Sequence, residues 1–80
     1  MWIRSQDKQK LGNYSFIFAR GKEIAAETNM DVDTLGEYKT VERTIEVLDK
    51  MQSHVETLEY LKVRPEAWQG ELLIYQMPQE

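Results

Sequence analysis

The stretch TVERTIEVLDKMQSHVETLEYL, residues 40–61, decides the fold of this chain. Its apolar residues recur at steps of four, three, three, four and three, which is the spacing of one face of an α-helix. Because β-patterned runs stand on both sides of this segment, we expect one long helix that buries its apolar stripe on a sheet. The stripe consists of Val41, Ile45, Leu48, Met51, Val55 and Leu58.

The ends of this helix are indicated by the residues that flank it. Thr40 is suited to the N-cap position, because its hydroxyl can accept a hydrogen bond from a free amide of the first turn. Pro65 disfavours helical backbone at Arg64, so the helix should stop by Val63. After Leu58, polar residues occupy the line of the apolar stripe. We therefore expect the last turn of the helix to fray.

Short runs with the period of two that is typical of β-strands surround the helix. Two of them, residues 14–19 and 71–77, are apolar on both faces and are expected inside a sheet. Gly21 and Lys22 suit a tight hairpin turn after the first of these runs. The full set of expected strands is residues 2–4, 14–19, 23–27, 34–38 and 71–77.

This order of elements predicts an α+β fold over one domain, residues 1–80. We expect a four- to five-stranded antiparallel or mixed sheet with one long helix packed on one face, in the order β-β-β-β-α-β. One helix covers only one face of such a sheet. The other face needs either the segment 65–70, which contains Trp68, or a second copy of the chain. We expect the second copy, in a two-fold homodimer.

Composition narrows the classes of function. The chain has 14 acidic and 10 basic residues, for a net charge of −4, and a chain with this balance is a poor default binder of nucleic acid. It has no cysteine, which excludes disulfides and thiolate chemistry. The first residues lack the apolar centre of a signal peptide, and no apolar run approaches the roughly 20 residues of a membrane span. We therefore expect a cytoplasmic protein that does not enter a membrane.

Three segments carry a resemblance to a known family. They are MWIRSQDK at residues 1–8, LGEYKTVER at residues 35–43 with EVLDKMQ at residues 46–52, and YQMP at residues 75–78. Together they resemble a family of small uncharacterised proteins found in Gram-positive bacteria, their phages and conjugative elements. The resemblance implies a cytoplasmic accessory protein related to a phage or mobile element. It supplies no catalytic or binding residue.

One incomplete metal-binding pattern lies before the helix. Four residues match the first, third, sixth and twelfth places of a calcium-binding loop, but the fifth and ninth places lack oxygen ligands. No helical pattern precedes the segment, so a polar loop that leads into the helix cap is the better interpretation. The four matching residues are Asp31, Asp33, Gly36 and Glu42. We predict that the chain binds no metal and no cofactor.

His54, the single histidine, lies at the flank of the helical stripe. A zinc site is not expected without cysteine or a second histidine. A catalytic triad would have to use His54, and no serine stands in a nucleophile motif. We predict that the chain is not an enzyme.

Large aromatic rings are the candidates for an interaction surface. They can form either the core or an interface between proteins. We predict protein–protein interaction, with this chain or another protein as the partner, through a surface drawn from Trp2, Tyr14, Phe16, Phe18, Trp68 and Tyr75. The alternative is a nucleic-acid-associated protein, whose contacts would come from the basic cluster of Arg4, Lys8, Lys10, Arg20 and Lys22.

Overall fold

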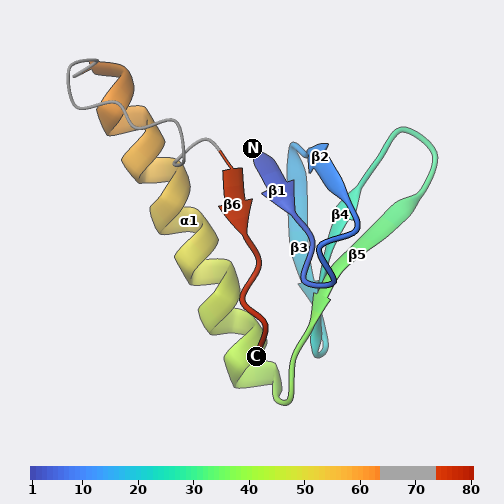
Figure 1. Cartoon of the computed structure of the whole chain (residues 1–80). Helices are drawn as coiled ribbons and strands as arrows, with labels where there is room; N and C mark the ends of the chain where they lie inside the picture. Colours follow the sequence, from blue (N-terminus) through green and yellow to red (C-terminus); the bar gives the residue numbers. More distant parts are fainter. Residues whose placement is uncertain (64–73) are drawn as a thin grey trace.

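Two small sheets and one helix form the fold (Figure 1). The structure, a computed structural model, describes residues 1–63 and 74–80. Within these residues the α+β class and the single long helix are confirmed. In chain order the elements are β1 (Trp2–Arg4), β2 (Leu11–Asn13), β3 (Phe16–Arg20), β4 (Glu23–Glu27), β5 (Val32–Glu37), α1 (Val41–Val63) and β6 (Ile74–Gln76).

The prediction of a single sheet of four to five strands is wrong. The strands form two three-stranded sheets, in the orders β2-β1-β6 and β3-β4-β5. β1 runs antiparallel to β2 and parallel to β6, so both of its edges are already paired and it cannot extend the second sheet. β2 departs from the expected pattern, because Gly12 and Asn13 are residue types disfavoured in strands.

The break between the two sheets falls inside the run 14–19. The Tyr14 amide donates to the main-chain oxygen of Met1 at 2.9 Å, which holds Tyr14 to the first sheet, and β3 begins only at Phe16. β5 begins at Val32, two residues before the predicted start. The predicted segment 65–70, and residues 71–73 of the predicted last strand, lie outside the described residues.

The core lies where the two sheets and the helix meet. Ile3 of β1 and Ile24 of β4 are fully buried, and Leu35 of β5 is 1% exposed. α1 contacts β3 and β4, and Figure 1 shows it passing beside β6. The buried cluster is completed by Tyr14, Ala26, Tyr38, Val47, Met51 and Met77. All three layers therefore contribute to one core.

The helix begins and ends where its flanking residues predict. Thr40 acts as the N-cap, since its hydroxyl oxygen accepts from the Arg43 amide at 3.0 Å. The hydroxyl of Thr44 donates to the main-chain oxygen of Thr40 at 2.9 Å, which allows this polar residue to be fully buried. α1 then continues to Val63.

The predicted buried stripe of the helix is confirmed at Met51 and is wrong at Val41, Ile45 and Val55. Val47 is fully buried and Met51 is 2% exposed, and with Thr44 they point into the core. Leu48 is only partly buried. With 100° between successive residues, the apolar side chains of α1 span roughly half of its circumference. The core covers only part of this apolar arc. The flank that the core leaves uncovered includes Val41, Ile45 and Val55.

A Leu-Gly-x-Tyr tetrapeptide occurs twice, at residues 11–14 and 35–38. In both copies the tyrosine ring folds over the glycine two residues before it. A Cβ atom added at Gly12 or Gly36 would lie 2.8 Å from the ring or hydroxyl of Tyr14 or Tyr38, respectively. Neither glycine has a positive φ, so what each position requires is space for the ring. The repeat fixes one buried tyrosine at the end of each sheet.

The side chain of Gln6 joins the first sheet to β5 and to the C-terminal residues. Its Nε2 donates to the main-chain oxygens of Glu37 at 3.0 Å, Pro78 at 3.2 Å and Gln79 at 2.9 Å. Its Oε1 accepts from the Glu37 amide at 2.9 Å, so the side chain pairs with β5 as a strand would. The main-chain amide of Gln6 also donates to the Leu35 oxygen at 2.8 Å. One side chain thus caps the outer edge of β5 at its C-terminal end.

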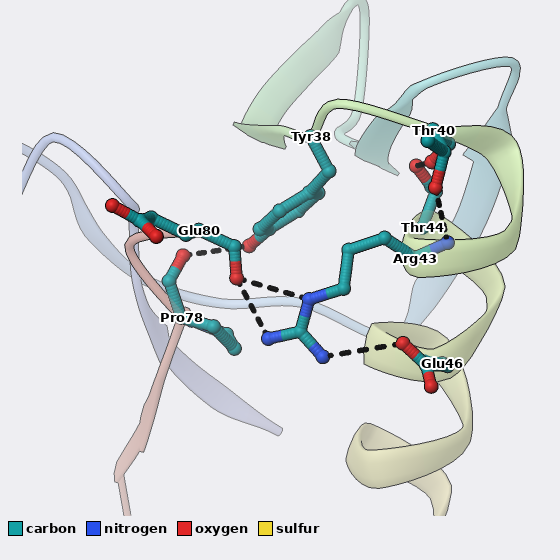
Figure 2. A network of polar contacts seen from close by, with 7 residues as sticks. All are labelled: Tyr38, Thr40, Arg43, Thr44, Glu46, Pro78 and Glu80. Atoms are coloured by element: carbon teal, nitrogen blue, oxygen red, sulfur yellow. Dashed lines mark hydrogen bonds and ion pairs between the residues drawn. The ribbon is translucent and has the colours of Figure 1, made fainter.

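A second set of bonds holds the last residues against the start of the helix (Figure 2). The Tyr38 hydroxyl donates to the main-chain oxygen of Pro78 at 3.0 Å. Arg43 donates to the main-chain oxygen of Glu80 through Nε at 2.9 Å and Nη2 at 2.7 Å. Its Nη1 lies 3.5 Å from Glu46. The three segments that carry the family resemblance therefore meet at one junction, and their polar groups there serve the fold.

Alkaline pH should destabilise the protein through Tyr38. Burial raises the pKa of Tyr38 to about 12 from the ordinary 10.0. Because the folded-state pKa is the higher one, its contribution to stability is complete below pH 10 and is lost progressively as pH rises through 12. Urea unfolding gives the free energy of unfolding at pH 8 and at pH 11. Between these two pH values, this free energy should fall less in Tyr38→Phe than in the wild type. Equal losses in the two proteins would contradict this role.

Candidate interaction surface

Within the described residues, one flank of α1 carries several exposed apolar side chains. Val41, Ile45 and Val55 are 48%, 44% and 42% exposed, and the partly buried Leu48 lies between them on the helix surface. We call these four residues the helix flank. Single exposed apolar residues are common on proteins, but these four recur at helical spacing on one side of α1, with the exposed Gln52 between Leu48 and Val55.

The helix flank faces away from the first sheet. Arg43 reaches the main-chain oxygen of Glu80, and the ring of His54 meets the ring of Tyr75 in β6 at 5.2 Å, so this side of α1 faces the C-terminal strand. Ile45 is two residues from Arg43, which places it about 160° away around the helix. The core stripe between these two sides rests on β3 and β4. The helix flank is therefore on the side of the second sheet, away from β6.

β3 provides an open sheet edge on that side of the second sheet. In the order β3-β4-β5 this strand pairs only with β4, and no other described residue forms a backbone hydrogen bond with it. In an antiparallel pair, alternate residues of an outer strand direct their N–H and C=O groups away from the sheet. Such an edge is ready to pair with another strand. We call these outward groups of Phe16–Arg20 the β3 edge.

Two phenylalanines mark the outer face of β3. Phe16 is 58% exposed, Phe18 is partly exposed, and their ring centroids are 5.7 Å apart. Ile17 and Ala19 alternate with them and pack toward the core. The strand thus presents apolar side chains above and below its open edge.

The remaining predicted aromatic residues occupy different places. Trp2 is 44% exposed on β1, on the outer face of the first sheet. Tyr14 is 8% exposed and belongs to the core, and Tyr75 is partly buried against it. Trp68 lies outside the described residues. The structure therefore brings together Phe16 and Phe18 from the predicted set, and adds the helix flank, which the sequence pattern had assigned to the core.

The predicted basic cluster is divided between two loops at one end of the molecule. Arg4, Lys8 and Lys10 belong to β1 and the loop after it, and Arg20 and Lys22 flank the β3–β4 turn. Both loops approach the end of β5, through Gln6 and through a bond from the Tyr38 amide to the Lys22 oxygen. Arg20 is paired with Glu23 at 3.1 Å, and the Nε of Arg4 donates to the Lys8 oxygen. Some of the basic side chains in this cluster are therefore already paired with a carboxylate or hydrogen-bonded to a main-chain oxygen.

A polar hollow of about 500 Å³ opens beside Phe16. Within it the Tyr14 hydroxyl donates to Asp33 Oδ2 at 3.3 Å. Burial, together with the charge of Asp33, raises the pKa of Tyr14, so the phenol stays protonated at neutral pH. A protonated phenol held by a carboxylate is not poised as a base. The hollow is lined by Asn13, Tyr14, Phe16, Glu27, Thr28 and Asp33 among others.

The acidic residues before the helix adopt structural roles. Asp31 Oδ1 accepts from the Val32 amide at 2.8 Å, and Asp33 and Gly36 lie within β5. Among residues 1–63 and 74–80, no cluster of three or more acidic or histidine side chains could hold a metal ion. The same residues contain no helix that is both long and apolar enough to cross a membrane.

No family model, curated protein or solved structure matches this chain. Function therefore has to be inferred from the geometry of the helix flank and the β3 edge.

Proposed function

We propose that this chain is a small cytoplasmic accessory protein, non-enzymatic, that acts by binding protein through the helix flank and the β3 edge. The observation that supports this proposal is that α1, which carries the exposed helix flank, contacts β3, whose outer edge is unpaired. Burial of a Val, Leu or Ile side chain yields about 1.5–3 kcal/mol when complete, so covering several half-exposed ones favours a protein partner. The resemblance to accessory proteins of phages and mobile elements is consistent with this role.

Nucleic acid is the weaker candidate. Its affinity depends on cations free to neutralise phosphates. Arg20 is paired with Glu23, and the loop that carries Lys8 and Lys10 also carries Asp7. The hydrogen bonds from the Ser5 hydroxyl and the Gln9 amide lower the pKa of Asp7, which keeps a negative charge within the cluster.

Ile45→Lys should abolish capture of protein partners. The variant places a charge within the helix flank, where a partner would have to bury it, while the 44% exposed position tolerates lysine in the folded chain. Immobilised wild type and variant would be exposed to the same nuclease-treated extract of a Gram-positive bacterium, and the bound proteins compared by quantitative mass spectrometry.

Val32→Lys is the matched control, because Val32 is 38% exposed on the opposite edge strand, β5. Proteins retained by the wild type and by Val32→Lys, and lost with Ile45→Lys, are the expected result. Capture from this nuclease-treated extract that is unaffected by Ile45→Lys would contradict the proposal. Circular dichroism of each variant verifies that it remains folded.

A further inference from the structure

We propose that the partner of this surface is a second copy of the chain. The β3 edges of two copies pair antiparallel around a two-fold axis at Phe18, and the two helix flanks pack on each other around Leu48. This inference rests on the proposed function and names its partner. The result is one continuous six-stranded sheet, β5-β4-β3 followed by β3-β4-β5 of the second copy, with two antiparallel helices on one face.

The side chains of β3 are complementary to themselves in this register. Antiparallel pairing centred on Phe18 places it opposite the second copy's Phe18, Phe16 opposite Arg20, and Ile17 opposite Ala19. The single charge of the strand, Arg20, therefore faces an aromatic ring and is not set against a second arginine. Like charges directly opposite one another are avoided across the whole strand.

The helix flank has the same symmetry. Val41 stands seven residues before Leu48, and Val55 stands seven residues after it. Antiparallel packing centred on Leu48 thus sets each Val41 against the other copy's Val55 and the two Leu48 side chains against each other. A seven-residue spacing keeps all three on one side of a helix. Three of the four flank residues, Val41, Leu48 and Val55, therefore match an inverted copy of themselves.

The two centres lie at similar distances from the end where the β3–β4 turn meets the chain that enters α1, as a single shared axis requires. The Tyr38 amide donates to the Lys22 oxygen at 2.8 Å, which places the β3–β4 turn beside the chain that enters α1. Leu48 is seven residues along the helix from Val41, a rise of about 10 Å. Phe18 is three residues along the strand from Gly21 in the turn, also about 10 Å. Strand pairing and helix packing are thus compatible in a single dimer.

Phe18→Cys tests this geometry directly, because the chain has no cysteine of its own. Residues opposite each other in an antiparallel pair have Cα atoms about 4.5–5.5 Å apart, within the range that a disulfide spans. Under mild oxidation we expect Phe18→Cys to convert to a covalent dimer. Leu48→Cys, the second position on the axis, should do the same and guards against a folding defect of the first variant.

Thr34→Cys is the control, since Thr34 is exposed on the outer face of β5, far from the proposed axis. Preferential cross-linking of Phe18→Cys and Leu48→Cys, with wild-type light scattering that shows a dimer at high concentration, supports the proposal. A wild-type mass that stays monomeric, or cross-linking of Thr34→Cys as fast as of the other two, overturns it. Failure here leaves partner capture through Ile45 as a separate result, so a failure of this inference can be distinguished from a failure of the proposed function.

Discussion

Gln6→Glu should destabilise the protein strongly at pH 7 and much less at pH 4. The substitution keeps the shape of the side chain but replaces the donating Nε2 by an oxygen. That atom lies within 3.2 Å of three main-chain oxygens, those of Glu37, Pro78 and Gln79. Loss of these bonds and the repulsion that replaces them should cost about 1–3 kcal/mol. An 80-residue domain has a total stability on the order of 4–12 kcal/mol, so the loss is a large part of it.

The pH dependence follows from the charge of the introduced carboxylate. Carbonyl oxygens on three sides disfavour the charged form, so the pKa of the glutamate is higher in the folded protein than in the unfolded chain. With that sign, the variant is most stable below the unfolded pKa, where the protonated carboxyl can still donate one bond, and it loses stability as pH rises. Urea unfolding of variant and wild type at both pH values gives the difference at each.

Gln6→Met serves as the control for this substitution. It removes the same hydrogen bonds without adding a charge, so its destabilisation should be smaller at pH 7 and independent of pH. If Gln6→Glu were as stable as the wild type at pH 7, Gln6 would not be the link between the two sheets and the C-terminal residues.

The helix could be placed from the sequence, but its orientation could not. Thr40 and Pro65 indicate its start and its limit, and these local signals do not depend on the rest of the fold. Which flank of a wide apolar arc is buried depends on the packing of the sheets. The buried residue Thr44 has no apolar character to reveal it, and its hydroxyl is satisfied within the helix by Thr40.

The division into two sheets is equally hidden from local patterns. β1 is three residues long and takes its partners from segments near both ends of the chain, β2 and β6. Alternation in residues 14–19 predicts one strand, yet Tyr14 is held by Met1 and only the remainder joins the second sheet. The alternation of apolar and polar residues in a three-residue strand does not indicate which distant segments it pairs with.

The candidate surface was visible in the sequence, although under a different interpretation. Val41, Leu48 and Val55 recur every seven residues, a spacing typical of helices that pack on other helices. The sequence predicts two-fold association from an open sheet face. In the structure the unpaired edge is that of β3 and the exposed helix residues are those of the helix flank, and the proposed dimer uses these two features.

Hydrogen exchange of the main-chain amides in Phe16–Arg20 tests self-association most directly. The outward amides of this strand are unprotected in a single copy and hydrogen-bonded in the proposed dimer. At a concentration of free partner about ten times the dissociation constant, their exchange should slow about tenfold relative to dilute protein. The outward amides of residues 32–34 in β5 should exchange at the same rate in both samples. Equal exchange of the β3 amides in dilute and concentrated protein would contradict the proposed dimer.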